Sequence, residues 1–162
     1  MKPSIISNTG PILALSGAGH LDLIMHLYAR VIVPESVDIE IRHGGKNRLG
    51  LTAYLQADWI QVKPAGTIDP LLFNQLDTGE AAVIALAIKE GISSILVDER
   101  KARKTARLIY NLNVLGTARI LIESKNDGLI HSVGDVLKRM QQNGYWIHNN
   151  IVDYALKMAH EI

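Results

Sequence analysis

The sequence predicts a three-layer α/β/α fold with a central, mostly parallel sheet and a helical C-terminal extension. Short apolar runs alternate with longer segments whose apolar residues recur at helical spacing, as in strands joined by helices. The runs are apolar throughout, which indicates strands covered by helices on both faces. A length of 162 residues with 48% hydrophobic residues suits a single domain, 1–162, with one core.

Five apolar runs are the expected strands, at residues 4–7, 31–33, 59–62, 94–97 and 114–115. Pro34 directly follows the second run and opens a helix. A further helix is predicted over about 79–90, with Asp77 or Thr78 as its N-cap. Gly91 ends this helix, as a C-terminal glycine commonly does.

The chain divides into a core over about 3–125 and two C-terminal helices within about 127–162. These helices are expected near 132–142 and 149–160, and residues 43–47 form a polar loop. The last helix carries apolar residues at i, i+3, i+4 and i+7, which either cover the core or form a dimer contact. These residues are Ile151, Tyr154, Ala155 and Met158.

Composition excludes several classes of protein. The chain has no cysteine, which rules out disulfides, cysteine zinc sites and thiol nucleophiles and fits a cytoplasmic location. A net charge of +1 argues against a protein that coats nucleic acid over its whole surface. The six histidines show no metal-binding spacing, and no phosphate-binding or dinucleotide-binding glycine motif is present.

Polar residues follow two of the expected strands. Asn8 comes after the first strand, and Asp98 comes after the fourth and is followed by Glu99. Ligands of open parallel sheets bind beyond the carboxyl ends of the strands, so Asn8 and Asp98 would meet there if the two strands are neighbours. The alternative for Asp98 is that it only caps the helix that follows.

Two more acids, Glu40 and Glu80, stand on helices among mostly apolar residues. Taken singly, Glu40 could be a surface acid paired with Arg42, and Glu80 a first-turn acid favoured by the helix dipole. Gathered together, such acids repel one another and favour a hard divalent cation. A ligand set of oxygens alone favours Mg²⁺ or Mn²⁺ over Zn²⁺ and points to phosphoryl chemistry.

The helix expected after Asp98 carries four cations on one face, at i, i+3, i+4 and i+7. They are Arg100, Arg103, Lys104 and Arg107. Either this face is solvated, or it binds the phosphates of a polyanion or an acidic partner. The opposite face should point to the core through Ala102, Ala106 and Ile109.

Several segments together resemble a PIN domain, over about residues 3–125. The two most specific are Leu-Asp-x-Gly-Glu-Ala at 76–81 and Asp-Glu-x-x-Ala-Arg at 98–103. Segments 5–15, 34–37 and 113–117 add to the likeness in order and spacing. The branch that the chain resembles is that of prokaryotic VapC-type toxin ribonucleases.

This resemblance implies a Mg²⁺- or Mn²⁺-dependent endoribonuclease that dimerises and is blocked by a protein antitoxin. The family's acidic set falls on four positions here, with Glu99 as an auxiliary metal ligand. Arg100 and Arg103 would contact phosphates of the RNA. The four positions are Asn8, Glu40, Glu80 and Asp98.

One position departs from the family pattern. The first acid is normally an aspartate, and Asn8 replaces it here with a neutral amide. The loss of this charge should weaken Mg²⁺ binding, so an alternative function is a catalytically impaired PIN-like module that binds RNA or protein. A second alternative is a phosphoryl-accepting regulatory domain that uses Asp98.

Overall fold

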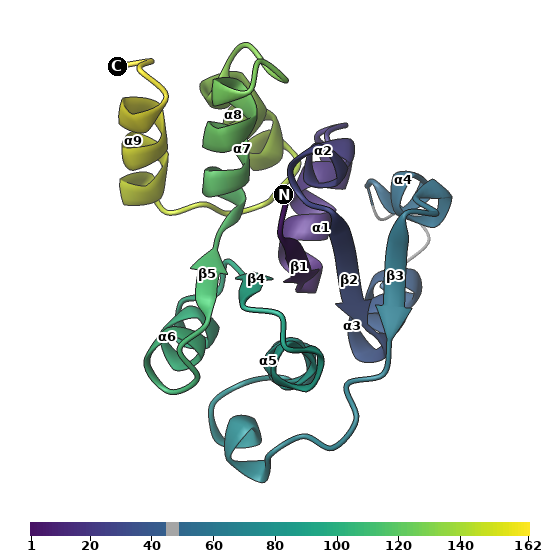
Figure 1. Cartoon of the computed structure of the whole chain (residues 1–162). Helices are drawn as coiled ribbons and strands as arrows, with labels where there is room; N and C mark the ends of the chain where they lie inside the picture. The colour runs from purple at the N-terminus through teal and green to yellow at the C-terminus, as the bar shows by residue number, and fades with distance from the viewer. Residues whose placement is uncertain (45–48) are drawn as a thin grey trace.

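One five-stranded sheet forms the centre of the protein (Figure 1). The structure is a computed structural model that describes residues 1–44 and 49–162. The strands lie in the order β3-β2-β1-β4-β5, and every neighbouring pair is parallel. They are β1 (Ser4–Ser7), β2 (Arg30–Pro34), β3 (Ile60–Lys63), β4 (Ser94–Leu96) and β5 (Asn113–Leu115).

The strand order reverses between β1 and β4. The chain runs outward from β1 to β2 and β3, then crosses back to place β4 and β5 on the other side of β1. Ser7 of β1 pairs with Leu96 of β4, and the backbone N–H of Asn8 donates to the carbonyl of Leu96 at 3.0 Å. A reversal of this kind opens a crevice at the carboxyl ends of the two strands.

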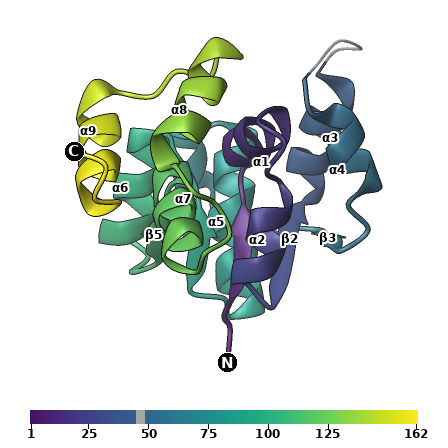
Figure 2. The ribbon, with the colours of Figure 1, turned by 90° about the horizontal axis from the view of Figure 1, so that it is seen from above.

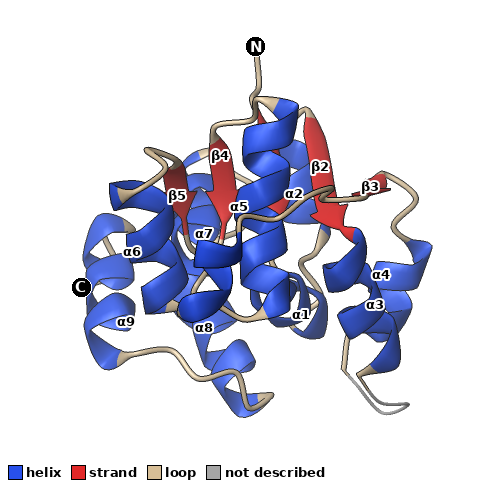
Figure 3. Cartoon of the chain, turned by 90° about the horizontal axis from the view of Figure 1, so that it is seen from below, coloured by secondary structure: helices blue, strands red, loops and turns tan. Residues whose placement is uncertain are grey.

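Helices cover both faces of the sheet, which confirms the predicted three-layer architecture. α5 and α6 lie on one face, and Figure 3 shows α5 crossing in front of the strands. α1, α2 and α7 lie on the other face, with α8 and α9 packed outside α7 (Figure 2). The helices are α1 (Thr9–Gly17), α2 (Asp22–Leu27), α3 (Glu35–His43), α4 (Leu51–Gln56), α5 (Thr78–Glu90), α6 (Arg100–Leu108), α7 (Thr117–Asn126), α8 (Val133–Gln142) and α9 (Asn149–Met158), with a short 3₁₀ helix at η1 (Pro70–Asn74).

The middle strands are fully buried because both of their faces meet helices. Ile5, Ile6, Ile95 and Leu96 have no exposed surface. On α5, every residue from Gly79 to Ala87 is buried, so this helix runs through the interior beside the sheet. A buried helix needs small side chains to approach strands closely, which accounts for its alanine-rich sequence.

The predicted ends of α5 are confirmed. Asp77 is the N-cap, and its side chain and that of Glu80 form a reciprocal capping box. Gly91 adopts a left-handed conformation with φ of 66° and ends the helix. Of the predicted polar loop, His43 ends α3, and residues 45–47 lie outside the described part of the chain.

The two C-terminal helices are present as predicted and are tied to the rest of the domain. α8 and α9 pack against α7 and against each other. The carboxylate of Glu161 accepts hydrogen bonds from the backbone N–H groups of Val133 and Gly134, at 2.7 and 2.9 Å, and from Lys125 at 2.9 Å. None of the described helices has the length and apolar character that a membrane span requires.

The prediction for Ile109 is wrong, and of the two alternatives left open for the α9 stripe, core packing holds for one residue. Ile109 was expected in the core but is 71% exposed, because α6 ends at Leu108 and Ile109 leaves the buried face. On α9, Ala155 alone of the predicted stripe is buried. Ile151, Tyr154 and Met158 remain 45–52% exposed, so the core explains one residue of the four.

Candidate active site

Asp98 lies at the carboxyl edge of the sheet and is held by residues from two other segments. Its Oδ1 accepts a hydrogen bond from the backbone N–H of Thr117 at 2.7 Å. Its Oδ2 accepts hydrogen bonds from the hydroxyls of Thr117 and Tyr145. Thr117 follows β5, and Tyr145 belongs to the segment between α8 and α9. Asp98 is therefore not a simple helix cap.

A second group of oxygens surrounds Gly79 at the start of α5. A Cβ on Gly79 would lie 3.2 Å from Oδ1 of Asn8 and 3.3 Å from Oε2 of Glu40. Glu40 also accepts a hydrogen bond from the hydroxyl of Thr9 at 2.7 Å. Asn8 and Glu40 are thus close in space, and a side chain at position 79 would press on both.

Arg42, which the sequence offered as the partner of Glu40, pairs with Asp38 instead. The guanidinium of Arg42 lies 2.9 Å from the carboxylate of Asp38, one turn earlier on α3. Glu40 is exposed, but it points toward the chain segment that follows β1, where Thr9 binds it.

Buried Glu80 interacts electrostatically with the acids around it. Its side chain is only 7% exposed, and Oε1 accepts a hydrogen bond from the backbone N–H of Asp77 at 3.1 Å. Burial raises the pKa of Glu80, and the charges of Asp77, Glu99 and Glu40 raise it further against the lowering effect of that hydrogen bond. The carboxylates near Glu80 therefore repel one another, as the sequence pattern led us to expect.

Glu99 and Arg103 lie beside Asp98. Glu99 is the N-cap of α6 and accepts a hydrogen bond from the backbone N–H of Ala102 at 3.1 Å. Arg103 donates from Nη1 to the carbonyl of Val97 at 2.9 Å, and burial lowers the pKa of its guanidinium. A Cβ on Gly116 would lie 2.8 Å from Nη1 of Arg103 and 2.9 Å from Oδ1 of Asp98, so this approach needs glycine.

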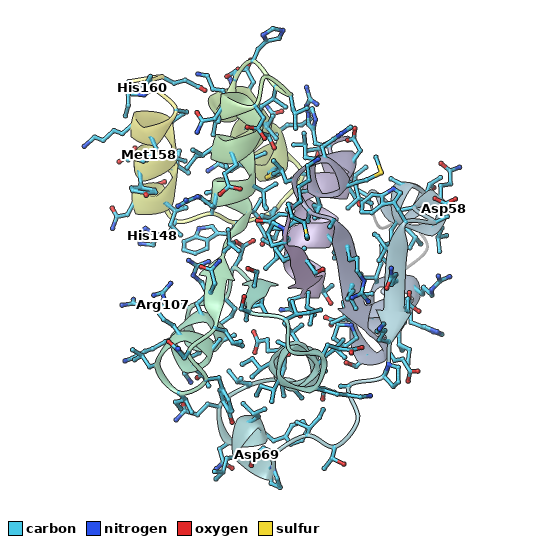
Figure 4. The ribbon with its side chains drawn as sticks, in the orientation of Figure 1. Asp58, Asp69, Arg107, His148, Met158 and His160 are labelled. Carbon is cyan, nitrogen blue, oxygen red and sulfur yellow. The ribbon has the colours of Figure 1, made fainter. Side chains whose placement is uncertain are left out.

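A cleft of about 830 Å³ opens between this edge and the C-terminal segment. Its lining includes Asn8, Asp98, Glu99, Arg100 and Arg103 of the predicted site. Glu40, Glu80, Lys104 and Arg107 do not line it. Figure 4 shows the side chains of Arg107 and His148 on the same side of the molecule. The predicted site thus divides into residues that line the cleft and residues that do not.

The donor chemistry of this edge suits a hard divalent cation, whereas the observed spacing is not that of a preformed metal site. The donors are oxygens of carboxylates and of one amide, which Mg²⁺ and Mn²⁺ prefer. Yet in residues 1–44 and 49–162, no three His, Cys, Asp or Glu side chains lie close enough together to hold a metal ion. Both oxygens of Asp98 already accept hydrogen bonds. A bound ion would need the carboxylates to draw together and Asp98 to release a donor.

Sequence reasoning missed Tyr145 and Thr9 and did not assign Thr117 a role. Thr117 lies two residues after β5, as Asp98 lies two residues after β4, so the rule applied to Asp98 could have found it. Tyr145 gives no such signal, because its contact with Asp98 depends on how α8 and α9 fold back over the sheet.

A family model described as a PIN domain matches residues 4–161. The chain belongs to the PIN-domain family. PIN domains are generally nucleases and typically use divalent metal ions, and membership suggests an RNA substrate. The match includes α8 and α9, beyond the region of about 3–125 that the motifs alone cover. Comparison with curated proteins and with solved structures finds no match.

PIN-domain membership favours a nuclease-type function over the phosphoryl-accepting alternative.

Proposed function

We propose that this PIN domain is a metal-dependent endoribonuclease that hydrolyses phosphodiester bonds of RNA at the carboxyl edge of β1 and β4. The observation that carries the proposal is the gathering of oxygens at the start of α5, next to buried Glu80. A Cβ on Gly79 would lie 3.2 Å from Oδ1 of Asn8, 3.3 Å from Oε2 of Glu40 and 3.6 Å from Oδ1 of Asp77. The repulsion among carboxylates gathered in this way would be relieved by a divalent cation. The cleft beside them has Arg100 and Arg103 on its wall, where an anionic substrate would be neutralised.

The ion, Mg²⁺ or Mn²⁺, would be held by Asn8, Glu40, Glu80 and Asp98, with Glu99 as an auxiliary ligand. When bound, such an ion supplies an activated water and stabilises charge that develops on the phosphate. Arg100 and Arg103 would orient the scissile phosphate in the cleft. Lys104 and Arg107, further along α6, would bind phosphates of the flanking strand.

In cells, we propose that the protein acts as the toxin of a VapC-type toxin–antitoxin pair, as a homodimer, with an antitoxin as its protein partner. The lack of cysteine is compatible with the reducing cytoplasm, where RNA is present. The exposed apolar residues of α9 outside the cleft are the candidate dimer contact, since the core leaves Tyr154 and Met158 uncovered.

The direct test is cleavage of several RNAs by the purified chain in Mg²⁺, in Mn²⁺ and in EDTA. We expect cleavage only with a divalent ion and none by Asp98→Asn. Glu40→Gln is the second variant, because Glu40 is exposed and its loss should leave the core intact. Asp58→Asn is the matched control, since exposed Asp58 precedes β3 at the amino end of the sheet. The absence of cleavage under all conditions contradicts the proposal.

Asn8 favours a second candidate function, a catalytically impaired PIN domain that binds RNA or protein. Its amide contributes no charge to the acidic edge. The variant Asn8→Asp separates the two functions. If Asn8→Asp cleaves RNA and the native chain does not, the native protein is the impaired form. If both cleave, the amide is part of a working site.

A further inference from the structure

The lining of the cleft includes a group of apolar residues from the C-terminal segment, which we call the base-binding wall. They are Trp146, Ile147 and Ile151, and the polar residues His148 and Asn150 of the same segment also line the cleft. Arg100 and Arg103 line the same cleft. The cleft therefore offers both cations suited to phosphates and apolar side chains suited to flat groups.

Trp146 is 77% exposed, which is unusual for a side chain of this size. Its backbone position is nevertheless fixed on both sides. Tyr145 is bound to Asp98 through its hydroxyl. Two residues further on, Nδ1 of His148 accepts a hydrogen bond from the backbone N–H of Asn150 at 3.0 Å and caps α9. The indole is thus presented to solvent by an anchored segment.

The indole keeps a flat face open. Trp146 and His148 meet edge to face, with ring centroids 5.6 Å apart and an angle of 87° between the rings. This geometry does not stack the two rings face to face, so His148 leaves the faces of the indole uncovered. An exposed indole on an anchored segment is a suitable platform for stacking a planar ligand.

We propose that Trp146, with Ile151 in the same lining, binds a nucleobase of single-stranded RNA whose phosphate lies against Arg100 and Arg103. This proposal rests on the proposed RNase function and adds a base-binding position to it. RNA is favoured over a protein partner because cationic and aromatic side chains line the same cleft as Asp98, and a nucleotide needs both. The position is sequence-tolerant, since every base offers a face for stacking.

The test measures binding in EDTA, so that cleavage plays no part. The probes are a short single-stranded RNA and an abasic ribose–phosphate oligomer of equal length. We expect Trp146→Ala to weaken RNA binding by about 5- to 100-fold, as loss of one stacked base does, and to change abasic binding less than about twofold. Trp146→Phe should restore most of the loss. Phe73→Ala is the control, since Phe73 is 48% exposed on η1 and does not line the cleft.

A second measurement follows the indole itself. The chain has two tryptophans, so Trp59→Phe leaves Trp146 as the only tryptophan. RNA should quench its fluorescence, and the abasic oligomer should not. The proposal is overturned if Trp146→Ala leaves RNA affinity unchanged, if it weakens both probes equally, or if the native chain binds no RNA.

The outcomes also separate this proposal from the proposed function. If binding depends on the bases but no metal supports cleavage, the proposed RNase function is overturned and the base-binding proposal stands. If Trp146→Ala changes neither RNA cleavage nor RNA affinity, only the base-binding proposal is overturned. A protein that copurifies with the native chain and changes the fluorescence of Trp146, while RNA does not, assigns the wall to a protein partner and overturns the proposal.

Discussion

The hydroxyl of Tyr145 donates a hydrogen bond to Oδ2 of Asp98, although 47 residues separate the two in the sequence. Burial and the neighbouring Asp98 carboxylate raise the pKa of Tyr145, so the hydroxyl keeps its proton at neutral pH. This contact fastens the segment between α8 and α9 to the carboxyl edge of the sheet. The C-terminal helices therefore take part in shaping the candidate site.

Tyr145→Phe should destabilise the protein and loosen this segment. Removing a hydrogen bond to a charged group costs about 1.5–3 kcal/mol in the free energy of unfolding. Urea denaturation measures the loss, and hydrogen exchange should show faster exchange between α8 and α9. Tyr154→Phe is the matched control, because its ring is half exposed on α9. Equal stability of the two variants would show that the Tyr145 contact contributes nothing.

Glu80→Gln should stabilise the metal-free protein at neutral pH. The glutamine oxygen still accepts from the backbone N–H of Asp77, while the repulsion from Asp77, Glu99 and Glu40 is removed. Because the folded pKa of Glu80 is raised, the native chain gains stability from this group as pH falls from 7 towards about 4. The variant should lack that gain. Thermal denaturation across this range measures it.

The same variant should lose its advantage when metal is added. Mn²⁺ relieves the repulsion in the native chain and should raise its melting temperature more than that of Glu80→Gln. If Glu80→Gln is less stable than the native chain at every pH, then the capping role of Glu80 outweighs the repulsion, and the crowding argument fails.

Glu161→Gln should weaken the attachment of the C-terminal helices in a pH-dependent way. Burial alone would raise the pKa of Glu161, but hydrogen bonds from Gly134, Lys125, Val133 and Ser132 outweigh it and lower the pKa to about 2. A depressed folded pKa stabilises the protein above the unfolded value, near 4.3, and this stability is lost as pH falls towards 2. We expect the variant to lose about 2 kcal/mol at pH 7 and nothing near pH 2. Denaturant unfolding at several pH values measures this, and a pH-independent difference would contradict it.

Arg100→Gln should reduce RNA binding more than Lys104→Gln does. Both residues are exposed on α6, but only Arg100 lines the cleft. Loss of one phosphate contact should lower affinity and reduce the salt dependence of binding by about one unit of slope. Titration of a short RNA at several salt concentrations in EDTA compares the two variants. A larger effect for Lys104→Gln would place the RNA outside the cleft.

The fold was predictable because its signals are local. Continuous apolar runs, Pro34 as the N-cap of α3 and Gly91 after α5 each act within a few residues, and the structure confirms them. The prediction for Ile109 is wrong because the apolar residues keep their helical spacing in the sequence beyond Leu108, where α6 ends. Where a helix stops depends on its surroundings, which periodicity does not contain.

The candidate site was predictable only in part, for the same reason. Residues that follow strands, such as Asn8 and Asp98, are brought together by a rule of parallel sheets, and β1 and β4 are indeed neighbours. The role of Tyr145 depends on a tertiary contact between distant segments, so no local sequence pattern predicts it. The sequence also does not show that both oxygens of Asp98 accept hydrogen bonds. Because of these bonds, the edge has suitable metal donors but, among the described residues, no preformed metal site.

The central claim is that oxygens from separate segments bind one divalent ion at the carboxyl edge of the sheet. The measurement that tests it most directly is a crystal of the native chain soaked in Mn²⁺, with anomalous scattering used to locate the metal. The account predicts a Mn²⁺ ion coordinated by oxygens of Asn8, Glu40, Glu80 and Asp98, with Tyr145 displaced from Asp98. No ion at this edge, at a Mn²⁺ concentration that saturates any RNA cleavage, or an ion bound only elsewhere, would contradict it.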